Sequence, residues 1–269
     1  MSIKGNVLAG EKTLFKNVGW LLVLQAVNII LPFVTVPYVT RVFGADNYGI
    51  FSIALNWVTY FQLIVEYGFN LSATKKVVEA KDGVELNRLV SAVVLARLGL
   101  VVACFVVVLV VGCASIATGD QLACMLVLFS MLVGIALQLN WLFQGLQDMK
   151  FITIATAASR GLSVVLIFLL VNDSSQLMLY SFLYSTTFLL SGVLTHWFAW
   201  KRYGIHMGLA SFRQILAEMR DGMPIFLSSA AGKIIGSLGV TVLGSCQPSV
   251  VVGSYAAILK IPQMVSLMV

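Results

Sequence analysis

Four basic side chains lie inside stretches of the sequence that are otherwise apolar enough to cross a membrane: Arg97, Arg160, Lys233 and Lys260. A charge at the centre of a bilayer costs at least about 2.5 kcal/mol, so it occurs mainly where it faces the interior of a helix bundle or a water-filled path. Guanidinium and ammonium groups in such a cavity can replace the water around a phosphate through charge-assisted hydrogen bonds. The four residues therefore predict a cavity that binds an anion.

The alternative is that each base pairs with a carboxylate or a backbone carbonyl of the protein. Glu66 is the only acidic residue clearly within the apolar stretches, and one acid cannot neutralise four bases. Glu66 is expected either to form a structural ion pair, with Arg88 or Arg97, or to titrate and couple a transport cycle to protons. Arg41, near a turn, either meets an anion that leaves the cavity or caps the first span.

The elements that must position these residues are membrane-spanning helices. Hydrophobic residues make up 59% of the 269 positions and charged residues 10%, with a mean hydropathy of +0.97, whereas a soluble domain is usually about 45–50% apolar. A stretch of about 20 apolar residues crosses about 30 Å of hydrocarbon. About eight such stretches predict an all-α integral membrane protein: 17–38, 48–70, 89–112, 120–143, 152–171, 177–200, 223–244 and 250–269.

The basic residues outside these stretches set the orientation. Of the 17 lysines and arginines, about twelve share one side of the membrane and only Arg41 falls on the other. An excess on the cytoplasmic side is the usual pattern, so the N-terminus is predicted to be cytoplasmic. The formal net charge of +6 then reflects topology and affinity for anionic lipid. No nucleic-acid-binding motif accompanies it, and we expect no nucleic-acid partner.

The cysteines indicate neither a metal site nor a disulfide framework. Cys104, Cys113, Cys124 and Cys246 lie in or beside apolar stretches without CxxC spacing. Free cysteine commonly behaves as a small buried hydrophobe. We therefore expect no metal and no cofactor.

Residues 201–222 depart from the spanning pattern. Ser211, with Gln214 three residues later, matches a capping box, and apolar residues recur there at helical spacing. These apolar residues are Leu209, Phe212, Leu216 and Met219. The pattern predicts an amphipathic helix on the cytoplasmic surface. A linker is the favoured interpretation, and a docking site for a partner is the alternative.

A faint internal repeat brackets this linker. Val42-Phe43-Gly44 followed by Gly49-Ile50-Phe51 is similar to Val242-Leu243-Gly244 followed by Gly253-Ser254-Tyr255. Both copies run through the membrane in the same direction, as do the parallel repeats of two-lobed transporters. The expected domains are a six-helix transmembrane lobe over 1–200, the linker over 201–222, and the first two helices of an incomplete second lobe over 223–269.

Four blocks of sequence resemble a known family. They are Leu31-Pro32 with Pro37-Tyr38-Val39-Thr40-Arg41-Val42-Phe43-Gly44, then Tyr48-Gly49, then Glu66-Tyr67-Gly68-Phe69-Asn70-Leu71-Ser72-Ala73-Thr74, and Trp141-Leu142-Phe143-Gln144-Gly145-Leu146-Gln147-Asp148-Met149. These blocks closely resemble the polysaccharide biosynthesis flippases, specifically the Wzx-type O-antigen transporters of the multidrug/oligosaccharidyl-lipid/polysaccharide exporter superfamily. The resemblance implies a MATE-like fold of about twelve helices in two lobes. This chain would carry about eight of them, either as a fragment or as a truncated and inactive gene product.

The resemblance also implies a function. Such proteins move undecaprenyl-pyrophosphate-linked O-antigen oligosaccharide from the cytoplasmic to the periplasmic leaflet of the bacterial inner membrane by alternating access, among membrane lipids and alongside the O-antigen polymerase machinery. The candidate contacts to this cargo are Arg97, Arg160, Lys233, Lys260 and Arg41.

Two other functions are weaker alternatives. A multidrug exporter of the same fold would ordinarily carry acids for cationic drugs, against the basic bias of this chain. A membrane glycan polymerase or ligase would need a sizeable outer loop and a nucleophile with its base, and neither is visible in the sequence. We therefore expect a transporter and not an enzyme.

Overall fold

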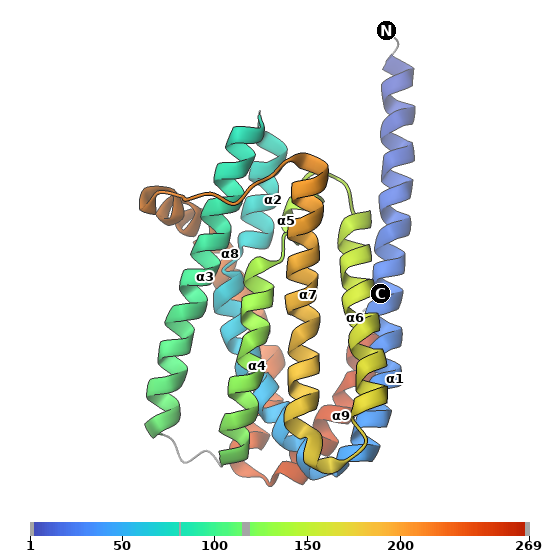
Figure 1. Ribbon diagram of the computed structural model, residues 1–269, viewed down its shortest axis with the longest axis vertical. Helices are drawn as coiled ribbons and strands as arrows, with labels where there is room; N and C mark the ends of the chain where they lie inside the picture. Colours follow the sequence, from blue (N-terminus) through green and yellow to red (C-terminus); the bar gives the residue numbers. More distant parts are fainter. Residues whose placement is uncertain (1–2, 81, 115–118, 267–269) are drawn as a thin grey trace.

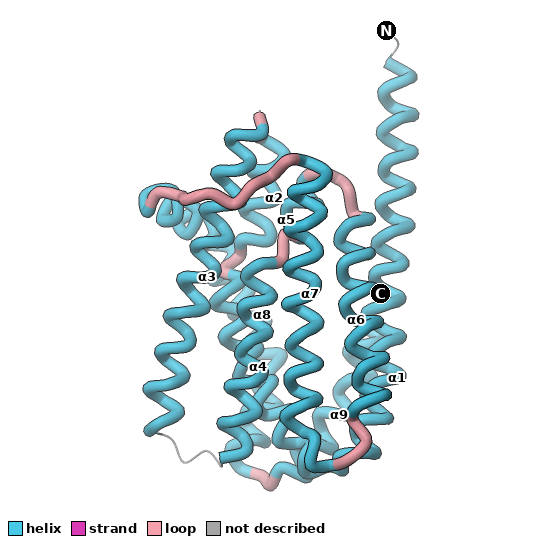
Figure 2. Tube along the Cα trace, in the orientation of Figure 1, coloured by secondary structure: helices cyan, strands magenta, loops and turns pink. Residues whose placement is uncertain are grey.

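The computed structural model describes residues 3–80, 82–114 and 119–266, and every regular element within them is a helix (Figure 1). In chain order the helices are α1 Ile3–Glu66, α2 Phe69–Glu79, α3 Gly83–Ala114, α4 Gly119–Leu137, α5 Asn140–Gly145, α6 Lys150–Leu170, a 3-10 turn Ser174–Gln176, α7 Leu177–Tyr203, α8 Phe212–Cys246 and α9 Ser249–Ser266. The longest described connection is residues 204–211, which cross one end of the bundle between α7 and α8 (Figure 2).

Several of these helices are membrane spans by length and composition. Five helical segments of the described chain can cross a bilayer, and a sixth is counted if α8, which bends by 50°, is one span. The expectation of an all-α integral membrane protein is therefore confirmed, and the protein is multi-pass. The count is lower than the eight apolar stretches because the first two stretches share one segment, Phe15–Glu79, and because the described side chains of α9 end at Leu259, so α9 is not counted as a span.

The first two stretches form two limbs of α1 that fold back on each other. The backbone leaves the helical region at Gly44, with φ 71° and ψ 176°. Glycine adopts such a positive φ at little cost because it has no Cβ. Figure 1 shows the first limb running from the N-terminus to this turn and the second limb returning into the bundle. Pro32 and Pro37 lie within the first limb, so the reversal occurs at the glycine and not at either proline.

Two apolar clusters make up the core, one towards each end of the bundle. The first contains Phe51 and Leu128, and the second contains Phe69, Trp141 and Phe143. Residues 138 and 139, between α4 and α5, are not helical. This break divides a span of 27 residues, Gly119–Gly145, and it leaves backbone groups inside the bundle that other parts of the protein must satisfy.

Helix α4 packs closely on α7 through two glycines. A Cβ added to Gly134 would collide with the backbone of Phe188, and one added to Gly192 would lie 2.8 Å from the carbonyl oxygen of Gly134. Small residues allow helices to approach this closely in membranes. The contact fixes the side chains of α7 against the break between α4 and α5.

The segment 201–222 is divided between two helices. Helix α7 continues to Tyr203 and α8 begins at Phe212. At the start of α8, the backbone N–H of Ser211 donates to the side-chain oxygen of Gln214 over 2.8 Å, which is one half of the expected capping box. Leu209, Phe212 and Leu216 are exposed, whereas Met219, the fourth residue of the predicted stripe, is half-buried and packs against the core cluster that contains Phe69. The exposed part of the stripe suits an amphipathic helix at a membrane surface.

Candidate functional site

Arg160 lies where two cavities meet inside the first 200 residues. It projects from α6 and lines both an aromatic cavity of about 140 Å³ and a polar cavity of about 190 Å³. Thr187 and Phe188 of α7 line both cavities as well. The guanidinium of Arg160 makes no hydrogen bond or ion pair with any residue that the structure describes.

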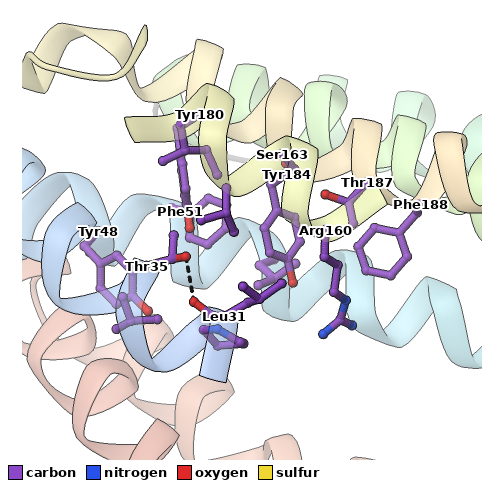
Figure 3. A pocket seen from close by; sticks show the side chains of 15 residues that line it. Leu31, Thr35, Tyr48, Phe51, Arg160, Ser163, Tyr180, Tyr184, Thr187 and Phe188 are labelled. Carbon is purple, nitrogen blue, oxygen red and sulfur yellow. Dashed lines mark hydrogen bonds between the residues drawn. The ribbon is translucent and has the colours of Figure 1, made fainter. Parts of the chain in front are cut away.

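The aromatic cavity is walled by rings from α1 and α7 (Figure 3). The ring of Phe51 lies 4.8 Å from that of Tyr180 and 5.5 Å from that of Tyr184, centroid to centroid. The ring of Tyr184 in turn lies 5.8 Å from that of Phe188. Figure 3 shows Arg160 extending beyond Tyr184 and Phe188, away from Ser163. The guanidinium therefore stands at one end of an apolar enclosure.

The polar cavity surrounds the break between α4 and α5. Side chains with amide or hydroxyl groups line it from four helices and from the break itself: Asn28, Gln138, Asn140, Gln144, Thr156, Thr187 and Ser191. Among the described side chains, no acidic one lines it. Arg160 is the only charged residue among the described residues that line it. The cavity therefore presents neutral hydrogen-bonding groups beside one positive charge.

Arg97 lies near this cavity but does not line it. Its side chain is buried, with 2% of its surface exposed. Its Nη1 donates to the backbone oxygen of Gln138 over 3.1 Å, and its Nη2 donates to Oδ1 of Asn70 over 2.9 Å. The guanidinium also lies 5.7 Å from the ring centre of Phe69. In this conformation Arg97 satisfies a carbonyl that the helix break releases.

Glu66 and Lys233 form an ion pair between α1 and α8. The distance between Nζ of Lys233 and Oε2 of Glu66 is 3.8 Å, and Oε1 of Glu66 accepts a hydrogen bond of 2.8 Å from Gln62. Lys233 forms this ion pair because α8 packs across the end of α1. Of the two expected partners, Arg97 makes no direct ion pair with Glu66 but lies within range of its charge. Arg88 is exposed on α3 instead.

The remaining two candidate bases do not join Arg160. Arg41 is exposed near the end of the first limb of α1. The backbone of Lys260 belongs to α9, but its side chain lies outside the described residues. The structure therefore places one base in the cavities, one behind the helix break and one in an ion pair.

Sequence reasoning from charges missed the uncharged residues of the site. Asn28, Gln138 and Asn140 line the polar cavity, and Tyr184 lines the aromatic cavity. A signal was present, since Gln138, Asn140 and Gln144 interrupt an otherwise apolar stretch at short intervals. Polar residues within a span usually face a bundle interior or a cavity.

The helices and cavities define a multi-pass membrane protein with a polar interior. The family described as "Polysaccharide biosynthesis protein" matches residues 14–269, and the chain belongs to this family. It is 28% identical over 249 residues to a protein of Escherichia coli (strain K12), with 91% of this chain and 59% of that protein covered. It is 27% identical over 249 residues to a protein of Shigella dysenteriae, with 91% and 62% covered.

Both relatives carry the name "Putative O-antigen transporter", in agreement with the resemblance that the sequence blocks indicated. Their name describes a transporter and not an enzyme. The chain spans about three-fifths of the length of these two proteins. No solved structure matches the chain significantly.

Proposed function

We propose that the protein is a flippase that moves an oligosaccharide linked to undecaprenyl pyrophosphate from the cytoplasmic to the periplasmic leaflet of a bacterial inner membrane. Membership of the polysaccharide biosynthesis family and the name of its relatives support a carbohydrate cargo. The observation that carries the proposal is Arg160, a guanidinium in a membrane interior that lines two cavities and has no hydrogen-bonding or ionic partner among the described residues.

An unpaired guanidinium in this place is suited to a phosphate. Burying a charge without a partner is costly, so the site is hydrated or takes up an anion. Guanidinium presents five N–H donors in a planar fork and binds phosphate oxygens in pairs. A pyrophosphate that entered the cavities would exchange its water for these donors, which lowers the cost of carrying its charge across the bilayer.

The other candidate bases have lesser roles in this proposal. Arg97 holds the wall of the polar cavity in the present conformation, and it reaches cargo only if it releases Asn70 and Gln138. Lys233 reaches cargo only if it releases Glu66. Lys260 and Arg41 remain candidate contacts along the path towards the other leaflet.

Alternating access requires contacts between the two lobes that can open on one side at a time. We assign residues 1–200 to one lobe and 223–269 to the first helices of the second. On the side of α2, Nζ of Lys76 lies 2.8 Å from Glu218 and 2.6 Å from Asp221 of α8. At the other end, Gly49 of α1 touches Gly253 of α9. The Glu66–Lys233 ion pair lies between α1 and α8, where a change of protonation or an arriving phosphate would loosen it.

Binding of lipid pyrophosphate tests the proposal most directly. The purified protein in detergent is titrated with undecaprenyl pyrophosphate and bound lipid is counted by native mass spectrometry. A charge-assisted hydrogen bond contributes about 1.5–3 kcal/mol, so Arg160→Gln is expected to weaken binding by about tenfold or more. Arg213→Gln, at an exposed position of α8, serves as the matched control and leaves binding unchanged. Equal affinities of the Arg160→Gln variant and the wild type would contradict the proposal.

Transport is tested with the same pair of variants in proteoliposomes. A fluorescent lipid pyrophosphate should become accessible to a quencher on the opposite leaflet with the wild-type protein and with Arg213→Gln, but much more slowly with Arg160→Gln. A wild-type rate no faster than that of empty liposomes would refute transport by this chain.

A further inference from the structure

The first turns of α8 have an outward face that the described part of the chain leaves uncovered. Phe212, Leu216 and Met223 are exposed, and at 3.6 residues per turn they fall within about 40° of one another around the helix axis. Arg213 and Arg220, which are also exposed, follow about 40–60° further round. The outward face therefore consists of an apolar stripe with two arginines along one edge.

The opposite side of the same turns packs on the bundle. Ile215 and Met219 pack against the second apolar cluster of the core. Glu218 and Asp221 pair with Lys76 of α2. The two acidic side chains of these turns are thus held towards the bundle, so the outward face carries a net positive charge.

The position of these turns matches the boundary of a membrane. Figure 1 shows the start of α8 outside α3, near the end of the bundle where α7 finishes. There α7 exposes Trp197 and Trp200, and Nζ of Lys201 lies 4.9 Å from the ring centre of Trp197. Tryptophan is enriched at the level of the lipid headgroups. The start of α8 therefore lies near the headgroups of the same leaflet.

A lipid interface accounts for both parts of the outward face. A helix surrounded by hydrocarbon carries few arginines because burying a charge there is costly, and a helix surrounded by water gains nothing by exposing phenylalanine and leucine. At the boundary, apolar side chains enter the outer part of the hydrocarbon while arginines stay at the level of the phosphates. Guanidinium groups bind phosphate oxygens through charge-assisted hydrogen bonds, and basic residues near a membrane favour anionic lipid.

We propose that the outward face of α8 docks on anionic phospholipid of the cytoplasmic leaflet. Phe212, Leu216 and Met223 insert, and Arg213 and Arg220 contact the headgroups. The choice of leaflet follows from the proposed orientation, whereas the docking itself goes beyond the proposed function and is observable without cargo. Because the opposite side of these turns is paired with α2, docking anchors the connection between the two lobes at the membrane surface.

The depth of a spin label in the bilayer measures this docking. A nitroxide is attached at Leu216→Cys, with Cys113→Ser and Cys246→Ser, because Cys104 and Cys124 are already buried. The protein is placed in liposomes of phosphatidylcholine, either alone or with about one lipid in three as phosphatidylglycerol. In the anionic liposomes the label should meet oxygen, which partitions into hydrocarbon, more often than a water-soluble nickel chelate. The ratio of immersed to water-exposed label should be about tenfold or more lower in phosphatidylcholine alone, since each arginine contributes about fivefold.

Substitution of one arginine separates charge from apolar contact. Arg220→Gln should lower the ratio about fivefold in the anionic liposomes and leave it unchanged in phosphatidylcholine alone. Arg88→Gln is the matched control and should keep the wild-type ratio, since Arg88 is an exposed arginine of α3 that lines a cavity between α3 and α8. A label at Ala217→Cys, about 100° round the helix from Leu216, should stay accessible to the nickel chelate. Because docking requires a charged bilayer, Arg213→Gln remains a control for cargo binding in detergent and for transport in liposomes of phosphatidylcholine.

Each alternative to docking on anionic lipid gives a distinct result that overturns the proposal. If the face lies in water, the label at position 216 stays accessible to the nickel chelate in the anionic liposomes. If a second copy or another protein covers the face, the label is shielded from both reagents. If charge plays no part, the wild type gives the same ratio in both liposomes, and Arg220→Gln keeps that ratio.

Salt provides a check that needs no variant of the arginines. At about 1 M salt the Debye length falls to about 3 Å, so the preference of the wild type for anionic liposomes should be lost. A preference that persists at this salt concentration contradicts electrostatic docking.

Discussion

Gly49 of α1 and Gly253 of α9 face each other in a reciprocal contact. The carbonyl of Ser249 occupies the place where a Cβ on Gly49 would lie, and the carbonyl of Ala45 occupies the corresponding place beside Gly253. Ala45 and Ser249 each precede their own glycine by four residues. The contact is therefore two-fold symmetric, and it joins the two copies of the faint repeat in the sequence.

Because of this contact, we expect that neither Gly49 nor Gly253 can be replaced by alanine without loss of stability. Gly49→Ala or Gly253→Ala is expected to push α1 and α9 apart, since the obstacle is backbone and cannot rotate away. Overpacking of this kind costs about 1–3 kcal/mol, which corresponds to a fall in melting temperature of about 2–10 °C for a chain of this size. Thermal unfolding in detergent measures the change.

A matched control for the glycine variants is Gly99→Ala in α3. No atom lies within 4 Å of a Cβ at Gly99, and alanine is the better helix former by about 1 kcal/mol. Gly99→Ala should therefore keep or raise the melting temperature. An unchanged melting temperature in both the Gly49 and the Gly253 variants would show that α1 and α9 do not pack this closely.

The helices, and the start of α8, could be predicted from the sequence because they depend on residues that are close together in the chain. The apolar stretches are helical because, in a bilayer, a helix satisfies the backbone within one segment. The pairing of Gln214 with Ser211 depends on residues three apart and was predicted for the same reason. The end of α7 at Tyr203 was less predictable, because the polar residues that follow the apolar stretch extend the helix beyond the membrane.

Contacts between side chains that are far apart in the chain could not be predicted from the sequence. Whether Arg97 faces a cavity or a carbonyl depends on the break after Leu137, and no proline or glycine marks that break. Glu66 and Lys233 are far apart in the chain, and their meeting depends on how α8 crosses α1. Arg160 was predicted to face a cavity and lines two, since an unpaired base in an apolar stretch has few other places to lie.

Arg97 and Arg160 should respond differently to mutation. Arg97→Ala removes the donors to Gln138 and Asn70 and leaves a void in place of a buried side chain. We expect a loss of about 2–5 kcal/mol in the free energy of unfolding and low protein abundance. Arg160→Gln breaks no hydrogen bond within the described chain and should keep normal abundance. Abundance in the membrane fraction, measured by immunoblot, distinguishes the two, and normal abundance of Arg97→Ala would contradict its structural role.

Lys76 is expected to hold α2 against α8 by ion pairing. Its Nζ lies 2.8 Å from Glu218 and 2.6 Å from Asp221, and the lysine is partly exposed, so the pairing contributes at most about 1 kcal/mol. Lys76→Glu should lower the melting temperature because three carboxylates would then adjoin. The combined change Lys76→Glu with Glu218→Lys should recover part of the loss. Independent, additive effects of the two substitutions in a double-mutant cycle would rule out the direct interaction.

The proposed orientation places the connection after α2 on the cytoplasmic side and the connection after α6 on the periplasmic side. These connections lie at opposite ends of the bundle (Figure 1). Reporter fusions after Glu79 and after Asn172 should therefore be active only as a cytoplasmic and a periplasmic reporter, respectively. The reverse result would invert the topology and the direction of transport.

The ion pair of Glu66 with Lys233 allows a test of its two possible roles. Glu66→Gln leaves the charge of Lys233 without a partner, and Lys233→Gln leaves the carboxylate of Glu66 without a partner. Each single change should therefore destabilise the protein. The pair is about one-third exposed on either side, so the loss is expected to be about 1 kcal/mol or less. With both changes neither member of the pair leaves the other without a partner, and most of the stability should recover. If the pair is structural, the double variant also recovers transport in proteoliposomes. If Glu66 couples transport to protons, the double variant is stable but its transport no longer responds to an imposed pH gradient.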